Sequence, residues 1–142
     1  MIDRRIGCAL FLAMTSVLSC SNDENPTVYV EQAGVPCQSA AQCYPLIDAA
    51  SLIGTATCMI PPSDGYCTHT CTQDSDCCAV PGECRTGLSQ VCTTYTSTTG
   101  KYCMLSCEGD AGDPQAYCHL YAHQSFVCAA SGGGDPRKVC KP

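Results

Sequence analysis

Apolar residues gather in one stretch near the N-terminus and are sparse in the rest of the chain. Residues 6–18 form an apolar stretch of 13 residues, which is too short to cross a bilayer as a helix. Arg4 and Arg5 precede this stretch and small residues follow it, which is the pattern of an export signal. We therefore expect residues 1–19 to be a signal peptide.

Further along the chain, β-branched and aromatic residues flank turns rich in Gly, Pro and Asp, a pattern that predicts β-hairpins. Three hairpins are expected, with their strands at residues 56–60 and 66–68, 90–96 and 101–105, and 125–129 and 137–140. Residues 27–30, with the sequence Thr-Val-Tyr-Val, predict one more short strand.

Helical signals are scarcer. Asp113 followed by Pro114 predicts a helix start, because an aspartate caps the first turn and proline fits its first position. Three side chains then make a small apolar face at helical spacing, at Tyr117, Leu120 and Tyr121. Residues 45–53 predict a second short helix.

The composition beyond the signal is too poor in large apolar residues to form an ordinary core. Residues 20–142 contain 16 Leu, Ile, Val and Phe residues, or 13%, and such chains do not fold unaided. The same residues are 12% cysteine, which marks a disulfide scaffold. A bridge that closes a loop of about 20 residues stabilises the fold by about 3 kcal/mol. Bridges can therefore replace the missing core, and they require an oxidising compartment.

The cysteine spacing indicates tandem repeats. Fourteen cysteines lie between residues 37 and 140, and twelve of them form three sets of four in which the first and third are 21 residues apart. The sets are Cys37, Cys43, Cys58 and Cys67; Cys71, Cys77, Cys92 and Cys103; and Cys107, Cys118, Cys128 and Cys140. We therefore expect a small disulfide-rich fold of three tandem four-cysteine repeats, residues 37–67, 71–103 and 107–140, with short β-hairpins, little helix and much coil.

Four cysteines allow three pairings. We favour first-to-third and second-to-fourth bridges within each repeat, because this pairing ties each hairpin to the loop before it. Cys78 and Cys84 fall outside the scheme and are expected to close a small extra loop. Tyr66 and Tyr102, each next to a fourth cysteine, are expected to pack over bridges.

One segment of the second repeat resembles a known kind of module. Cys71-Thr-Gln-Asp74-Ser-Asp76-Cys77 is similar to the Cys-x-x-Asp-x-Asp-Cys segment of cysteine-rich modules in secreted proteins, including bacterial lipoproteins with tandem repeats. The first repeat lacks these aspartates. The resemblance implies no catalytic residues.

The end of the signal resembles the lipobox of bacterial lipoproteins, in the sequence Val17-Leu18-Ser19-Cys20. The resemblance implies cleavage before Cys20, a diacylglycerol thioether on its sulfur and an added fatty acid such as palmitate. Residues 20–36 would then be a lipidated tether, and the residue after Cys20 is a serine, which favours the outer membrane of the bacterial cell envelope. The alternative is a plain secretory signal, which would release a secreted protein.

The number of cysteines favours the lipid. Removing Cys8 with the signal leaves 15 cysteines, and an odd cysteine in a secreted protein implies a free or intermolecular thiol. If Cys20 carries lipid, 14 remain, which is enough for seven bridges.

The net charge limits the partners. Residues 20–142 carry 12 acidic and 5 basic side chains, a net charge of −7. This charge argues against binding to nucleic acid and against electrostatic docking on anionic lipid. The expected partners are the lipid bilayer, through acylated Cys20, and an unidentified protein or glycan.

Three groups of side chains are candidate metal ligands, and no cofactor is expected. His119 and His123 are four residues apart and could share a zinc ion, but two ligands do not make a site. Aspartates at 74 and 76, and the acidic residues Glu108, Asp110 and Asp113, could bind Ca²⁺. We expect these aspartates to accept hydrogen bonds from their own turns instead.

Catalytic motifs for hydrolases and metalloproteases do not occur in the sequence. Paired cysteines would leave no thiol nucleophile. The sequence therefore favours a non-enzymatic envelope lipoprotein whose repeats form an interaction or structural domain. A small inhibitor or toxin-like binder is the alternative, using a rigid loop at residues 79–83 or the hairpin tip at residues 96–101, with exposed Tyr95, Tyr117 or Tyr121 as contacts; a hydrolase is a third hypothesis.

Overall fold

The computed structural model describes residues 32–59, 65–84, 88–96, 98–109 and 112–142. The signal, Cys8, Cys20, the predicted strand at residues 27–30 and Asp110 lie outside the described residues. Among the described residues, no helix combines the length and the apolar character needed to cross a membrane.

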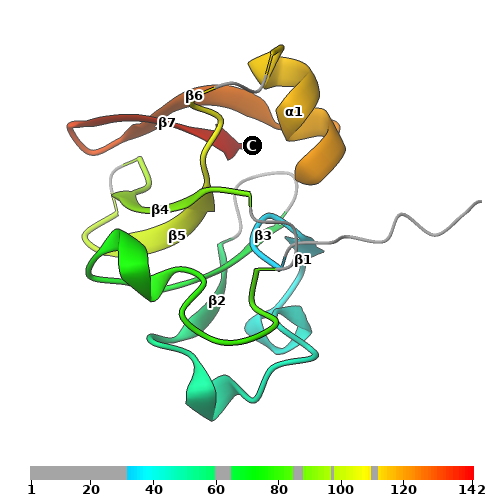
Figure 1. The fold of residues 1–142 in the computed structure, drawn as a ribbon, viewed down its shortest axis with the longest axis vertical. Helices are drawn as coiled ribbons and strands as arrows, with labels where there is room; N and C mark the ends of the chain where they lie inside the picture. Colours follow the sequence, from blue (N-terminus) through cyan, green and yellow to red (C-terminus); the bar gives the residue numbers. More distant parts are fainter. Residues whose placement is uncertain (1–31, 60–64, 85–87, 97, 110–111) are drawn as a thin grey trace, which may run out of the picture.

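Each repeat contains one antiparallel hairpin, and Figure 1 shows the three hairpins in chain order along the long axis of the molecule. The strands are β2 (Ala56–Met59) and β3 (Gly65–His69), β4 (Gln90–Thr94) and β5 (Lys101–Leu105), and β6 (Val127–Gly132) and β7 (Asp135–Lys141). The third and fourth cysteines lie directly opposite each other in every hairpin, as Cys58 and Cys67, Cys92 and Cys103, and Cys128 and Cys140. The three predicted hairpins are confirmed.

The turn of the third hairpin is tighter than the sequence predicted. Gly132 pairs with Asp135, so only Gly133 and Gly134 remain in the turn, with φ of 61° and 86°. Two positive φ values in succession match the strand twist of a two-residue hairpin turn, and glycine adopts them without a steric cost.

A third backbone segment lies beside the fourth-cysteine strand of each repeat. In repeat one this segment is β1 (Pro36–Cys37), where Pro36 pairs with Tyr66. In the next two repeats it is the spacer that follows the previous repeat, where Thr70 pairs with Tyr102 and Ser106 with Val139. The residue before the first cysteine therefore pairs with the residue before the fourth cysteine in every repeat.

A 3₁₀ turn precedes the second cysteine in repeats one and two. These turns are η1 (Ala40–Gln42) and η3 (Asp74–Asp76). Asp76 Oδ2 accepts the backbone N–H groups of Thr72 and Gln73 at 2.7 and 3.1 Å. Gln42 Oε1 accepts the two N–H groups at the matching positions of repeat one, at 2.6 and 3.3 Å. Repeat one therefore forms the same turn with an amide in place of a carboxylate.

In repeat three the helix α1 (Pro114–Tyr121) takes the place of the 3₁₀ turn. The predicted helix start is confirmed, since Asp113 Oδ1 accepts the N–H groups of Gln115 and Ala116 at 2.9 and 3.2 Å. Figure 1 shows α1 against the hairpin of β6 and β7.

The second predicted helix, at residues 45–53, is wrong. The segment contains only one 3₁₀ turn, η2 (Ala49–Ser51), which Asp48 caps. Leu52 is buried, whereas Leu46 and Ile53 are exposed. The segment has no continuous buried face, and a short helix without tertiary packing is not stable in water.

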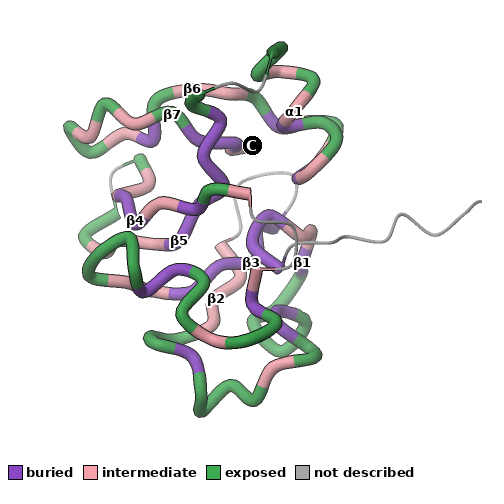
Figure 2. Tube along the Cα trace, viewed as in Figure 1, coloured by how far each residue is buried: buried purple, intermediate pink, exposed green. Residues whose placement is uncertain are grey.

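The largest apolar core lies where the three repeats meet, as the buried stretches of β3, β5 and β7 in Figure 2 show. Tyr66 of repeat one stacks on Phe126 of repeat three, with ring centroids 5.5 Å apart. The N–H of Leu105 in repeat two donates to the Tyr66 hydroxyl at 3.0 Å. One buried tyrosine therefore contacts all three repeats.

Candidate functional site

Seven disulfides are formed, and each lies within one repeat. The first-to-third bridges are Cys37–Cys58, Cys71–Cys92 and Cys107–Cys128, with Cα atoms 5.9, 5.8 and 5.9 Å apart. The second-to-fourth bridges are Cys43–Cys67, Cys77–Cys103 and Cys118–Cys140, at 5.3, 5.5 and 5.2 Å. The seventh bridge is Cys78–Cys84. This pairing agrees with the one predicted, and the matching distances show that the three repeats are built alike.

The bridges decide what the cysteines can do chemically. Three groups of cysteine sulfurs lie within 4.8 Å of one another, one group in each repeat. Zinc and other soft metals bind thiolates, but all of these sulfurs belong to disulfides. The fourteen cysteines of residues 37–140 therefore offer neither a metal ligand nor a thiol nucleophile.

The two histidines considered for zinc do not form a metal centre in the described residues. His119 lies on α1, exposed, with its Nε2 2.6 Å from the Gln115 side chain. His123 lies beyond the end of α1, with its Nδ1 2.7 Å from Ser125 Oγ. Within the part of the chain that the structure describes, neither histidine joins a group of three metal-ligating side chains.

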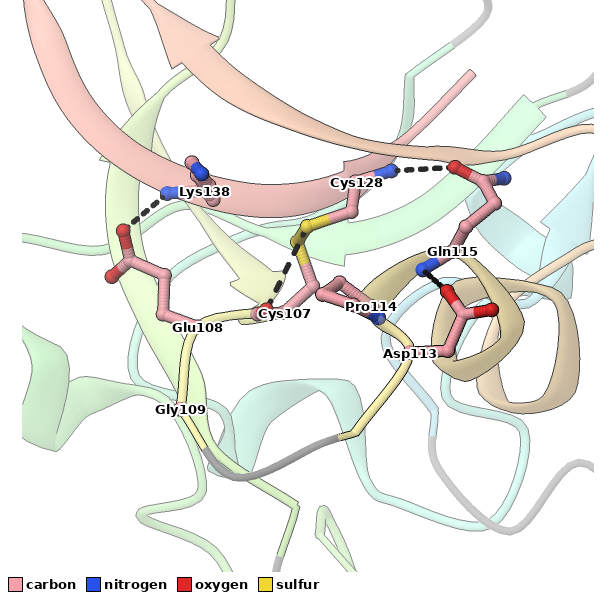
Figure 3. A pocket seen from close by; sticks show the side chains of 8 residues that line it. All are labelled: Cys107, Glu108, Gly109, Asp113, Pro114, Gln115, Cys128 and Lys138. Atoms are coloured by element: carbon pink, nitrogen blue, oxygen red, sulfur yellow. Dashed lines mark hydrogen bonds between the residues drawn. A yellow bond between two sulfur atoms is a disulfide. The ribbon is translucent and has the colours of Figure 1, made fainter.

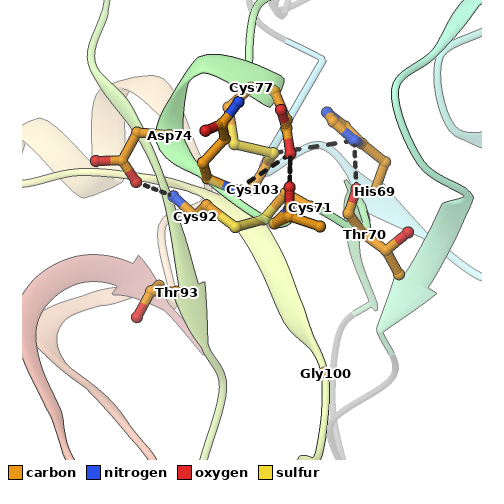
Figure 4. The surroundings of a disulfide bond; sticks show 12 residues. His69, Thr70, Cys71, Asp74, Cys77, Cys92, Thr93, Gly100 and Cys103 are labelled. Atoms are coloured by element: carbon orange, nitrogen blue, oxygen red, sulfur yellow. Dashed lines mark hydrogen bonds between the residues drawn. A yellow bond between two sulfur atoms is a disulfide. The ribbon is translucent and has the colours of Figure 1, made fainter.

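Of the two aspartates of the second repeat, Asp76 accepts hydrogen bonds from its own turn, as predicted, whereas Asp74 accepts them from more distant parts of the chain. The hydroxyl and N–H of Thr72, with the N–H of Gln73, hold the pKa of Asp76 down to about 2. Asp74 Oδ1 accepts the Cys92 N–H at 2.8 Å (Figure 4). These carboxylates support the turn and the hairpin.

Asp74 also reaches the third repeat. Its Oδ1 lies 2.7 Å from a guanidinium nitrogen of Arg137 on β7, and Arg137 donates in addition to the Cys92 carbonyl. Arg137 contacts Asp135 as well, at 3.0 Å, and holds the pKa of that carboxyl well below its usual range. This polar cluster joins repeats two and three.

The most buried charges join repeats one and two. His69 on β3 and Glu83, in the loop closed by Cys78–Cys84, are both 0% exposed, with His69 Nε2 2.6 Å from Glu83 Oε1. His69 Nδ1 lies 3.2 and 3.0 Å from the carbonyl oxygens of Ile53 and Thr70. Both ring nitrogens face acceptors, so the geometry favours a doubly protonated ring opposite an ionised Glu83.

The pKa values of this pair shift in the matching directions. Burial disfavours the charged ring of His69, but the hydrogen bond and charge of Glu83 outweigh it, so the pKa of His69 is raised. Burial likewise disfavours the charged carboxylate of Glu83, but donors from His69 and the loop backbone lower its pKa. The His69 ring also lies edge-on to the Tyr44 ring, with ring centroids 5.5 Å apart. Its Nδ1 lies 3.9 Å from the Cys103 sulfur, and Figure 4 shows His69 beside the Cys77–Cys103 bridge.

Sequence analysis missed this pair. His69 and Glu83 are 14 residues apart and belong to different repeats, so their contact depends on how the loop of repeat two docks on repeat one. The only signal in the sequence is the extra pair of cysteines, Cys78 and Cys84, which indicates that the loop is held in place.

An open pocket of about 530 Å³ lies on the third repeat (Figure 3). Its lining residues are Cys107, Glu108, Gly109, Asp113, Pro114, Gln115, Cys128 and Lys138. Glu108 Oε1 accepts the Lys138 backbone N–H at 2.8 Å, and Gln115 Oε1 accepts the Cys128 N–H at 3.4 Å. The carboxylate of Glu108 and the amide of Gln115 thus accept hydrogen bonds from the walls of the pocket itself.

The two loops considered for inhibition differ in exposure. In residues 79–83, Ala79, Pro81 and Gly82 are exposed, but Glu83 is buried and anchors the loop. At the tip of residues 96–101, the described residues Thr96, Thr98 and Thr99 are exposed, and Ser97 lies outside the description. The first loop is the one that the protein holds in place from inside.

The seven bridges, the short antiparallel hairpins and the small helical content define a small disulfide-rich protein. In comparisons with known proteins, no family model matches the chain, and no curated protein or solved structure is similar to it at a significant level.

Proposed function

We propose that the protein is a lipid-anchored lipoprotein of the bacterial cell envelope, placed in the outer membrane. Its cross-linked repeats act as a non-enzymatic interaction or structural domain. Acylated Cys20 holds the chain to the bilayer, and residues 21–36 separate the domain from the lipid. The partner of the domain is a protein or a glycan.

The observation that carries this proposal is the complete pairing of the cysteines in residues 37–140. Seven bridges use all fourteen of them. Once Cys8 is removed with the signal, Cys20 has no cysteine within the chain left to pair with. A thioether to lipid gives this sulfur a stable bond, and two or more acyl chains give stable anchoring.

Membrane fractionation tests the anchor. Wild-type protein is expected in the membrane fraction and to be released only by detergent, whereas Cys20→Ser is expected to be soluble or to retain its signal. Cys8→Ser is the matched control, because it changes a cysteine of the signal itself and is expected to fractionate like wild type. Wild-type protein that is soluble without detergent would overturn the proposal.

A disulfide-stabilised inhibitor is the second candidate, and the loop of residues 79–83 is the observation that favours it. Its own bridge closes the loop, and buried Glu83 fixes it from inside. A loop that is ordered before binding loses less entropy on binding, which suits a protease inhibitor.

A panel of proteases incubated with the folded protein tests this candidate. An inhibitor of this kind is expected to block at least one protease, and that protease is expected to shield the Val80 and Gly82 amides from hydrogen exchange, or the loop from cleavage. If no protease in the panel is inhibited and the loop is never shielded, the inhibitor hypothesis fails while the lipoprotein proposal stands.

A further inference from the structure

The Cys78–Cys84 bridge differs from the other six in its exposure. Cys78 is the only exposed cysteine of the fourteen bridged ones, all of which the structure describes, and Cys84 is half-buried. Every other bridge has at least one buried cysteine. Disulfide exchange begins when a thiolate reaches one sulfur of the bridge, so access decides which bridge reacts first.

The backbone at Cys78 and the surroundings of Cys84 also suit exchange. Cys78 has φ of 74°, a left-handed conformation that is strained for a residue with a Cβ atom. Gln90 Nε2 lies 2.9 Å from Cys84 Sγ and donates to it. An amide donor at this position stabilises a thiolate on Cys84, and a stabilised thiolate is the better leaving group.

We propose that Cys78–Cys84 is a thiol–disulfide exchange site for a dithiol reductant. A thiolate of the reductant attacks Cys78 Sγ, the Cys78–Cys84 bond breaks, and Cys84 leaves as a thiolate beside Gln90. The second thiolate of the reductant then attacks the reductant's first sulfur, which is bonded to Cys78 in the mixed disulfide. This step releases the Cys78 thiolate and closes a disulfide in the reductant. Two electrons have then passed from the reductant to the protein. The two protons lost by the reductant's thiols protonate the Cys78 and Cys84 thiolates.

Opening this bridge acts on the contact between repeats one and two. The loop that the bridge closes carries Glu83, whose Oε2 accepts the Val80 N–H at 3.1 Å and whose Oε1 holds His69. Reduction removes the covalent closure of that loop, while the other six bridges keep each hairpin tied to the earlier part of its own repeat. The exchange site therefore controls how firmly Glu83 is held against His69.

Limited reduction of the full-length protein in detergent tests the exchange site. The protein is treated with dithiothreitol, quenched with acid at intervals, alkylated and mapped by peptide mass spectrometry. Cys78 and Cys84 are expected to be labelled at least about ten times faster than any other cysteine, given the dependence of exchange on access. The proposal is overturned if another bridge opens as fast or if all seven open together.

Two further measurements distinguish selective exchange at Cys78–Cys84 from a general destabilisation of the fold. Gln90→Met keeps the side-chain length but removes the amide donor, and it is expected to slow labelling of Cys84 while leaving the other six bridges as slow as in wild type. In wild-type protein, the ring nitrogen NMR signals of His69 are expected to shift when Cys78–Cys84 opens. Ring signals that stay unchanged after the bridge opens would overturn the coupling to Glu83.

Discussion

At the scale of single residues, the buried pair of His69 and Glu83 is the place where a substitution is expected to destabilise the fold strongly. Removing two charges from water is costly, and their attraction offsets that cost only when both partners are present. Each of the two side chains is 0% exposed. Substituting one partner leaves the other as a buried charge without its counter-ion, or forces it to change its protonation state.

Glu83→Gln is therefore expected to lower the free energy of unfolding by about 3 kcal/mol, the typical cost of breaking a buried ion pair. Denaturant unfolding with the bridges intact measures it. Glu108→Gln is the matched control, because Glu108 is exposed and a glutamine oxygen can still accept the Lys138 N–H. The free energy of unfolding of the control is expected to stay within about 0.5 kcal/mol of wild type. An equal loss of stability in both variants would show that the buried pair does not stabilise the fold more than an exposed glutamate does.

The same pair predicts a pH dependence of stability. The folded pKa of His69 is raised above 6.5, so its contribution is complete below pH 6.5 and is lost as the pH rises through the folded pKa. The folded pKa of Glu83 is lowered below 4.5, so its contribution is complete above pH 4.5 and is lost on acidification. Stability from the pair is thus greatest between pH 4.5 and 6.5.

Thermal melting of wild type and Glu83→Gln from pH 4.5 to well above pH 6.5 checks the sign. Wild type is expected to lose stability as the pH rises above 6.5. In Glu83→Gln, burial without a counter-ion lowers the pKa of His69 below 6.5, so the contribution of His69 to stability is expected to rise with pH up to 6.5 and to stay constant above it. Parallel curves for the two proteins would contradict the assignment of a charged His69.

Tyr66 supports the core through its hydroxyl as well as its ring. Tyr66→Phe keeps the stacking on Phe126 but leaves the Leu105 N–H without an acceptor. The expected loss is about 1–2 kcal/mol in the free energy of unfolding. Tyr102→Phe, at the equivalent position of repeat two, is the control and is expected to cost less, because Tyr102 is only half-buried.

At the scale of elements, β1 lies so close to the first hairpin that no side chain fits on Gly65. A Cβ atom on Gly65 of β3 would lie 1.9 Å from the carbonyl oxygen of Cys37 on β1 and 2.6 Å from Cys58 Sγ. No L-side chain fits there while β1 remains paired, and both neighbours are fixed by the same bridge.

Gly65→Ala is accordingly expected to cost about 3 kcal/mol or more, as overpacking against fixed atoms does, and to lower the yield of protein with the native bridges after oxidative refolding. Gly65 has no positive φ, so its backbone conformation does not require glycine. Gly134→Ala shows for comparison what backbone conformation alone costs, because Gly134 has φ of 86° but open space around it. That control is expected to cost about 1 kcal/mol. A Gly65 variant that refolds as well as the control would contradict the close packing of β1 on β3.

The elements differ in how far the sequence could predict them. The hairpins and the bridge pairing were predictable because cysteine spacing and turn residues are local signals, as in the 21-residue separation shared by all three repeats. The helix at Pro114 was predictable from its cap. The equivalence of Gln42 and Asp76 was not, because an amide and a carboxylate make the same turn without sharing a motif.

At the scale of the whole molecule, the sequence was silent on how the repeats dock. The contacts of Tyr66 with Phe126, of His69 with Glu83 and of Asp74 with Arg137 join residues of different repeats. Such contacts depend on the arrangement of the hairpins in space, which no local periodicity encodes. The four-residue spacing of His119 and His123 is likewise only a local signal, and among the described residues neither histidine joins a group of three metal-ligating side chains.

The bridges and the anchor are linked in one account of the whole chain. Seven bridges stand in for a large apolar core, and they leave Cys20 as the single cysteine of residues 20–142 outside the bridged set. An oxidising compartment is needed to form them, and lipid attachment would remove the remaining thiol from that compartment's exchange chemistry.

Intact mass of the native protein, combined with thiol counting under denaturing conditions, tests this account most directly. The account predicts a chain that begins at Cys20, carries the added mass of a diacylglycerol thioether and an amide-linked acyl chain, and contains no reactive thiol. A soluble chain beginning at Cys20 with one reactive thiol would contradict it.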